Sequence, residues 1–464
     1  MSHTISLGGF NSRIVRYVDF IAAIVAVCVV GRLAWQEDLD WTAAVVVCVL
    51  VVFLTTLRWP YGILTLLIGA SAMPVFSLNV FGWNARPEHF AVFFAIIAVG
   101  TWIVVGKRQL KLNRLDYCIV WFVGANFVGS SFGSSAPAMT LRWALQNCLA
   151  VLFYFLVRLL VEDFTMLQRA VRIFLTIAVV ESLYGMFSYL SHQIFETSFG
   201  VQVGQYLGDV AAPFGTMYEP NLFGAYTASA AVIFFSIYLF AGHHVRDLVG
   251  FLITAIASFL SFSRAALIAL LVVGAYLFWK NHRQTRGKAL RKLLTVALIA
   301  ALLLVLFSGP LGRIVRERFT SLLNEGLTEE TTITRVIVMQ EALQDLPGHL
   351  LIGQGTASFN LTFDWSRYVS YWAGEKTWIG NAPLRILHDT GLLGLSSIFA
   401  FFVFVWLQTR RALKFPSQKN FLVLALWAGA IIYAISFQST DGTILAFTWV
   451  QLGFLASAAN FSPS

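Results

Sequence analysis

The sequence predicts an all-α membrane protein, a polytopic transmembrane helix bundle with a large extracytoplasmic loop that contains short helices. Of its 464 residues, 58% are hydrophobic and only 12% are charged, and the mean hydropathy is +0.74. Soluble domains carry roughly twice that share of charge. The apolar runs are continuous rather than alternating, which favours helices over a barrel, the only other structure that satisfies its backbone in lipid.

About fourteen apolar runs are long enough to cross a bilayer, and about twelve remain if the short or weak runs are left out. In order they are 17–34, 41–57, 61–76, 90–105, 117–133, 141–161, 173–190, 222–240, 248–262, 265–279, 293–307, 384–408, 421–437 and 444–458. The first run follows basic residues without a convincing cleavage site, so we expect an uncleaved first span.

Three short segments between these runs are basic: 106–114, 280–292 and 409–420. Lys and Arg concentrate in cytoplasmic loops of membrane proteins. We therefore place all three segments, and both termini, in the cytoplasm, and we attribute the net charge of +9 to them rather than to nucleic-acid binding. Even numbers of spans separate the three segments, as this orientation requires.

Motifs for metals and nucleotides are missing from the sequence. The four cysteines fall within apolar runs, and the acidic pair Asp38 and Asp40 is better explained as a solvated turn than as a cation site. Neither a His-x-x-x-His pair nor a glycine-rich phosphate loop is present. We expect metal-independent chemistry without a cofactor, driven by the substrate itself.

The chain divides into four parts by this topology: N-terminal spans (1–190), central spans with a first outward loop (191–308), a large outward loop (309–381) and three C-terminal spans (382–464). A tight outward turn, 439–442, joins the last two spans. Within the large loop, Val336, Met339, Leu343 and Leu346 repeat at helical spacing ahead of Pro347 and Gly348. This pattern predicts an amphipathic surface helix that begins near Arg335 and ends at Pro347.

Three arginines fall on the outward side, against the general trend: Arg142, Arg264 and Arg335. Charges at span ends are costly, which makes them candidates for function. A guanidinium binds phosphate oxygens in a bidentate fashion, so converging arginines would suit a pyrophosphate or another anionic lipid headgroup. For each arginine alone, snorkelling to the outer headgroups is an equally good explanation.

Glu219, Pro220 and Asn221 precede a span in the first outward loop. Asn221 is interpreted as the helix cap. Glu219 has no such local role, and a partly desolvated carboxylate there is either a general base or the salt-bridge partner of an arginine.

Two further groups of outward residues precede the last spans. Gly353 and Gly355 fit a tight turn, where glycine serves either positive φ or the close approach of a ligand, and turn geometry is the favoured explanation. Asn381, Arg385, His388 and Asp389 follow near the outer end of one helix. Arg385 and Asp389 are spaced to pair, and His388 is better explained by packing than by proton transfer.

These motifs resemble the O-antigen ligase and Wzy O-antigen polymerase superfamily of bacterial membrane glycosyltransferases, which are GT-C-like. The matching pieces are FSRAAL (262–267), the helix from Arg335, LLIGQG (350–355) and NAPLRILHDTGLLG (381–394). The resemblance covers the chain from about Pro213 onward, and the large outward loop before the last spans is also typical of the family.

The resemblance implies an enzyme of the bacterial inner membrane in surface polysaccharide biosynthesis. It would transfer or polymerise a glycan from a polyprenyl pyrophosphate donor onto a glycan or lipid acceptor, with Arg264 and Arg335 holding the leaving group. Many relatives begin the last motif with His-Asn and continue to Glu-x-Gly, whereas this chain has Gly380, Asn381, Asp389 and Gly391. Glu219 or Asp389 would then replace the missing base, or the activated leaving group would need little base assistance.

Two other functions compete with glycosyl transfer. One is a transporter or flippase for an anionic or lipid-linked substrate, and the other is a non-catalytic scaffold. An outward cleft under the long loop would favour transfer, whereas a central polar cavity open to both sides would favour transport.

Overall fold

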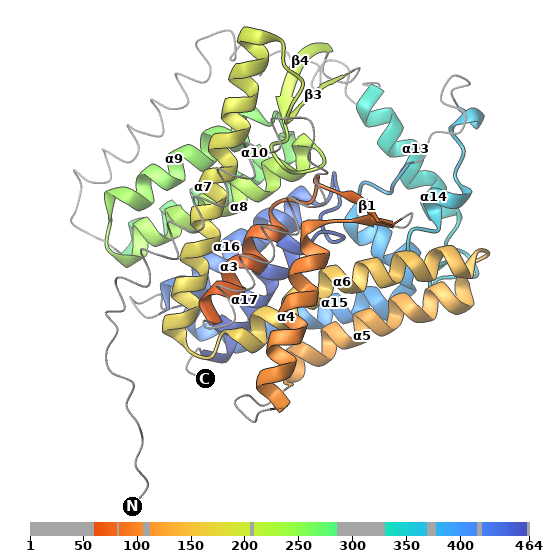
Figure 1. Cartoon of the computed structure of the whole chain (residues 1–464), viewed down its shortest axis with the longest axis horizontal. Coiled ribbons are helices and arrows are strands. Elements are labelled where there is room, and N and C mark those ends of the chain that lie inside the picture. The colour runs from red at the N-terminus through yellow and green to blue at the C-terminus, as the bar shows by residue number, and fades with distance from the viewer. Residues whose placement is uncertain are drawn as a thin grey trace, which may run out of the picture.

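The computed structural model describes residues 60–80, 83–104, 112–204, 208–284, 330–368, 377–414 and 420–461. The predicted spans 17–34, 41–57 and 293–307 lie outside these residues. Each of the other predicted spans falls on one helix, so the all-α fold class is confirmed (Figure 1).

Seven helices in the described part of the chain are long and apolar enough to cross a membrane. They are α4 (Pro87–Val104), α5 (Arg114–Val128, extended by a π-helical turn to Gly133), α6 (Pro137–Leu160), α7 (Phe164–Phe195), α8 (Pro220–Ala241), α10 (Arg264–Gln284, with its span over Arg264–Asn281) and α15 (Ala382–Lys414). Shorter helices complete the bundle: α3 (Pro60–Ser71), α9 (Val245–Leu260), α16 (Phe421–Ser436) and α17 (Ala446–Phe461). Two antiparallel ribbons connect helices, β1 (Leu78–Val80) with β2 (Trp83–Ala85) and β3 (Val201–Gly204) with β4 (Gly208–Pro213).

Helix α8 forms the centre of the bundle and is buried along almost its whole length. It packs against α9, α10 and α16. Small residues allow these close approaches, as is typical of membrane helices: a Cβ built on Gly250 of α9 would lie 2.5 Å from the Phe234 ring of α8. A polar contact adds specificity, because the Ser229 hydroxyl donates to Oε1 of Gln451 in α17 at 2.8 Å.

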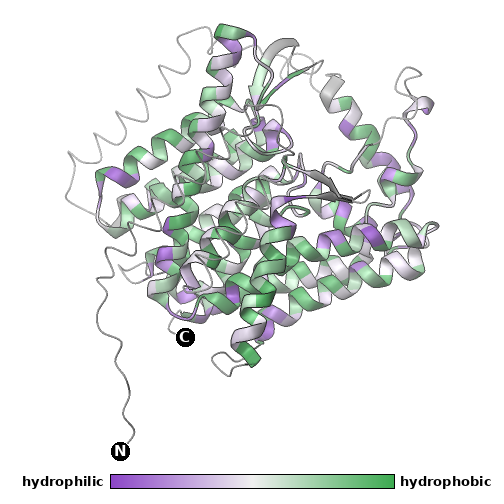
Figure 2. Ribbon diagram, viewed as in Figure 1, coloured by the Kyte–Doolittle hydropathy of each residue, from purple (hydrophilic) through white to green (hydrophobic). Residues whose placement is uncertain are grey.

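The described ends of the basic segments make contacts with one another or with α17. Lys280 Nζ donates to the carbonyl oxygen of Leu413, and the side-chain amides of Asn113 and Asn460 hydrogen-bond at 2.9 Å. The second and third basic segments thus meet through their described residues, and the first ends beside the end of α17, as expected if these parts share one side. Figure 2 shows hydrophobic helix centres, with hydrophilic residues concentrated at helix ends and in the segments near α13 (Glu330–Gln344).

Helix α13 confirms the predicted helix in the outward loop, although it begins at Glu330 and ends at Gln344. Val338, Ala342 and Leu346 are buried, whereas Met339 and Leu343 are exposed. The buried residues pack with Phe359 of α14 (Phe359–Thr362) and other apolar side chains of the loop, forming a separate small core. The buried face of α13 is therefore turned toward this small core.

Helix α15 is interrupted at Gly391, which has φ 63° and ψ −164°. The interruption frees carbonyl groups that segment 350–355 uses: the Gln354 N–H donates to the His388 carbonyl at 2.8 Å, and the Gly355 N–H donates to that of Asp389 at 2.9 Å. Beyond the break, the Leu392 N–H donates to the Leu350 carbonyl at 2.8 Å. Segment 350–355 is thus held to α15 by backbone hydrogen bonds on both sides of Gly391.

Candidate active site

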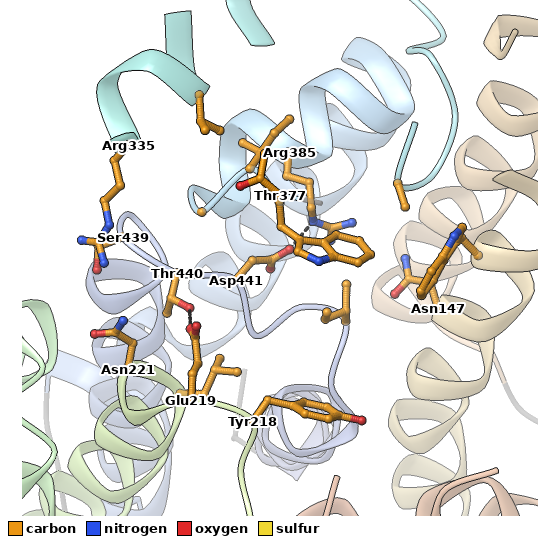
Figure 3. Close-up of a pocket in the computed structure, with 18 of the residues that line it drawn as sticks. Asn147, Tyr218, Glu219, Asn221, Arg335, Thr377, Arg385, Ser439, Thr440 and Asp441 are labelled. Atoms are coloured by element: carbon orange, nitrogen blue, oxygen red, sulfur yellow. Dashed lines mark hydrogen bonds and ion pairs between the residues drawn. The ribbon is translucent and has the colours of Figure 1, made fainter. Parts of the chain in front are cut away.

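A cavity of about 740 Å³ lies among helix ends on the side away from the basic segments. Its walls come from α6, the start of α8, α13, the start of α15 and the turn between α16 and α17. Four of the predicted site residues line it: Glu219, Asn221, Arg335 and Arg385. Figure 3 shows these four side chains around the turn that carries Ser439, Thr440 and Asp441.

Glu219 occupies the N-cap position of α8, yet its side chain makes no capping hydrogen bond. It turns instead to the Thr440 hydroxyl, which donates to Oε1 of the carboxylate. Burial raises the pKa of Glu219 above its usual range, while the hydrogen bond from Thr440 and the charge of Arg335 act in the opposite direction. A carboxylate in this state is suited to accept a proton.

Asn221 is not the helix cap that the sequence predicted. Helix α8 begins at Pro220, whose fixed φ suits the first helical position, so the cap falls on Glu219. Asn221 lies in the first turn and lines the cavity.

Arg335 extends from α13 toward the turn that carries Ser439 (Figure 3). Its positive charge lowers the pKa of Glu219, so the two residues interact electrostatically. The sequence left open whether Glu219 acts as a base or pairs with an arginine. The observed geometry fits both roles of Glu219, because the carboxylate is buried, as suits a base, and also lies near the charge of Arg335.

Arg385, in the first turn of α15, is held by three side chains. Nη1 lies 3.0 Å from Oδ2 of Asp389, which confirms the predicted pairing, and the guanidinium also contacts Asp441 and Thr443. All of these groups except Thr443 are buried. Asp441 is itself oriented by the Thr443 N–H, which donates to Oδ1 at 2.8 Å.

Asp389 lies behind the cavity wall. Its Oδ2 accepts the Ala357 N–H at 3.0 Å in addition to Arg385, and its side chain is buried. His388 is also buried, with Nδ1 3.4 Å from Oδ1 of Asp389 and its ring edge-to-face with Phe359. These positions suit residues that orient Arg385 rather than residues that meet a substrate.

The remaining predicted residues support the site or lie beside it. Asn381 caps α15, because its Oδ1 accepts the Leu384 N–H at 2.9 Å. Gly353 and Gly355 have φ of 74° and 93°, and a Cβ on Gly353 would lie 2.4 Å from the Asp389 carbonyl carbon. The group that approaches Gly353 closely is therefore the backbone of α15. Arg142 and Arg264 are not among the described residues that line the cavity.

Sequence reasoning missed two groups of cavity residues. Arg86, just before α4, donates to the Tyr218 hydroxyl at 3.0 Å and pairs with Glu88 at 2.7 Å. The other group comprises Trp143, Gln146 and Asn147 of α6 and Trp378 near α15. The spacing of the three α6 residues could have indicated a shared helix face, but nothing in the sequence places Arg86 beside Tyr218.

The site combines cations that can hold an anion with a carboxylate that can accept a proton. Among the described residues, no group of three or more His, Cys, Asp and Glu side chains is placed to hold a metal ion. Residues 249–399 match the family model described as O-antigen ligase. The chain carries an O-antigen ligase domain.

The O-antigen ligase domain covers about a third of the chain, from α9 into α15. It contains Arg264, Arg335 and Arg385, whereas Glu219 precedes it. The match supports the O-antigen ligase and Wzy superfamily, a group of membrane enzymes of glycan processing. No curated protein matches the chain significantly.

Proposed function

We propose that this protein is a glycosyltransferase that transfers or polymerises a saccharide from a polyprenyl pyrophosphate donor. The acceptor is a glycan or a lipid-linked glycan at the outer face of the bacterial plasma membrane. The observation that carries the proposal is that Glu219 and Arg335 line the same cavity in a protein with an O-antigen ligase domain, near enough for the charge of Arg335 to act on the carboxylate.

In the proposed reaction, an acceptor hydroxyl attacks the anomeric carbon of the donor sugar. The bond from that carbon to the pyrophosphate oxygen breaks, and the leaving pyrophosphate keeps the electron pair. Glu219 accepts the hydroxyl proton. Arg335 stabilises the charge that grows on the pyrophosphate, an interaction that strengthens as the bond breaks and so lowers the barrier.

Arg385 contributes to this site in a different way. Two buried carboxylates neutralise it, so it adds directed N–H groups rather than net charge. Arg142 and Arg264 stay proposed ligands of the donor or of neighbouring lipid headgroups on the same side. The position of the cavity among helix ends, beneath α13, supports transfer over transport.

The test uses purified full-length protein in liposomes with a polyprenyl pyrophosphate oligosaccharide and an acceptor. We expect longer or transferred glycan and released polyprenyl pyrophosphate without added metal or nucleotide. Glu219→Gln protein serves as the matched negative. If the wild-type protein gives no product with a verified donor and acceptor, the proposal is wrong. That result would favour the non-catalytic scaffold function.

A further inference from the structure

One wall of the cavity combines two indole rings that none of the proposed steps uses. Trp143 comes from α6 and Trp378 from the segment before α15, and their ring centroids lie 5.2 Å apart with planes at 82°. Trp378 is 39% exposed, whereas the adjacent Ile379 is buried. An exposed indole in a cavity offers a flat apolar face together with an N–H donor.

Asn147 lies one helical turn beyond Trp143, on the same face of α6, and its amide has a defined orientation. The Asn126 Nδ2 donates to the Phe122 carbonyl at 2.8 Å, so Asn126 Oδ1 must act as the acceptor, and it receives Asn147 Nδ2 at 3.0 Å. The Thr356 hydroxyl donates to the same oxygen at 3.0 Å. These bonds turn Oδ1 of Asn147 away from Asn126.

The Asn147 Oδ1 is buried and has no hydrogen-bond partner among the described residues. Buried amide oxygens nearly always have a partner, so this one marks a place where a ligand donor is expected. Figure 3 shows the Asn147 amide turned from α6 toward the cavity, on the side away from Arg335 and Asn221.

We propose that Trp143, Trp378 and Asn147 form a subsite for a pyranose ring. The C–H face of a pyranose packs against an indole, and a ring hydroxyl donates to Asn147 Oδ1. A prenyl chain would cover the indoles but would leave the amide oxygen without a partner, which is unfavourable in a buried position. The inference rests on the proposed function and assigns the two sides of the cavity: Arg335 to the anion and α6 to the sugar.

Direct binding tests the subsite independently of turnover. Wild-type protein in detergent is screened on an array of microbial oligosaccharides, and the glycan that binds is then titrated. We expect Trp143→Ala and Trp378→Ala to weaken binding about tenfold each, as the loss of a strong aromatic contact does. Asn147→Leu should do the same, and Trp143→Phe should retain part of the affinity.

Trp406→Ala is the matched control, because Trp406 is 51% exposed on α15 and does not line the cavity. Its affinity should equal that of the wild type, and thermal unfolding of each variant checks that the fold is intact. Equal affinity of folded Trp143→Ala, Trp378→Ala and Asn147→Leu would overturn the inference, and so would a wild-type protein that binds no glycan on the array.

The sugar belongs either to the donor or to the acceptor, and kinetics separates the two. A donor sugar predicts that the Trp variants lose affinity for glycosylated polyprenyl pyrophosphate and keep affinity for the sugar-free lipid. An acceptor sugar predicts a raised KM for the acceptor alone. Glycan binding without turnover would leave the subsite standing and contradict the proposed reaction.

Discussion

Arg385 and Asp389 form a buried ion pair one turn apart on α15, with 3.0 Å between Nη1 and Oδ2. Asp441, from the turn between α16 and α17, contacts the same guanidinium from another helix pair. One cation therefore joins the start of α15 to the turn that also supplies Thr440, the partner of Glu219. The position of the proposed base depends on this connection.

Replacing Arg385 by Met should strongly destabilise the protein, because it leaves two buried carboxylates without their cation. We expect a loss of about 3–5 kcal/mol, measured by unfolding in a denaturing detergent. The double variant Arg385→Met/Asp441→Asn should lose less than the sum of the two single losses. Strictly additive losses would show that Arg385 and Asp441 do not stabilise each other.

Glu219→Gln should lower turnover about 100-fold or more, since the amide keeps a partner for Thr440 but cannot accept a proton. Glu196→Gln is the control: Glu196 lies in the same outward loop, at the end of α7, and does not line the cavity. Glycan product quantified against released polyprenyl pyrophosphate measures the effect. Full activity of Glu219→Gln would assign the residue to structure alone.

The rate should fall at mildly acidic pH. Burial raises the pKa of Glu219, so the carboxyl stays protonated at pH values where an exposed glutamate has already ionised. A base must be deprotonated, and activity is therefore lost as pH falls through the raised pKa and regained above it. In Glu219→Gln protein, this limb of the pH profile of kcat/KM should disappear. Its persistence would assign the titration to another group.

Arg335→Ala should lower kcat/KM for the donor about 100-fold, the usual cost of one charge-stabilising donor. Arg367→Ala is the matched control, because Arg367 pairs with Glu341 of α13 at 3.6 Å with 64% of its side chain exposed. Arg264→Ala tests the other proposed ligand and should reduce glycan production with folding unchanged. Normal product from the Arg335 and Arg264 variants would favour the scaffold function.

A comparison of Gly353 with Gly348 distinguishes two reasons why a position requires glycine, a positive φ and the close approach of another backbone segment. Both have positive φ, 74° and 91°, but a Cβ on Gly348 meets nothing within 4 Å. Gly348→Ala should cost about 1–2 kcal/mol for backbone conformation alone. Gly353→Ala should cost a further ~1–3 kcal/mol because of its contact with the α15 backbone. Equal unfolding midpoints for the two variants would contradict the observed close packing.

The sequence predicted the helices well because long apolar runs admit few other structures in lipid. It also grouped Glu219, Arg335 and Arg385 on one side, since the side of each loop follows from the span order and basic segments. It placed the cap of α8 at Asn221, whereas the helix begins one residue earlier, at Pro220. It could not show which side chains of α13 are buried, because a local pattern does not reveal which neighbour covers a helix.

Other features of the site depend on contacts between distant segments. Asn126 meets Asn147 and Thr356 only after α5, α6 and the outward loop have packed together. Arg86 and Tyr218 are 132 residues apart in the chain. No periodicity or short motif encodes such a meeting, so a single sequence cannot predict it.

The break at Gly391 limits how the cavity can open. Backbone hydrogen bonds on both sides of Gly391 fasten segment 350–355 to α15, so this segment cannot swing outward as a lid without losing them. A bulky glycan must therefore enter past another wall of the cavity, such as the one that α13 supplies. These hydrogen bonds give the site one wall of fixed shape, against which a bound glycan can be positioned.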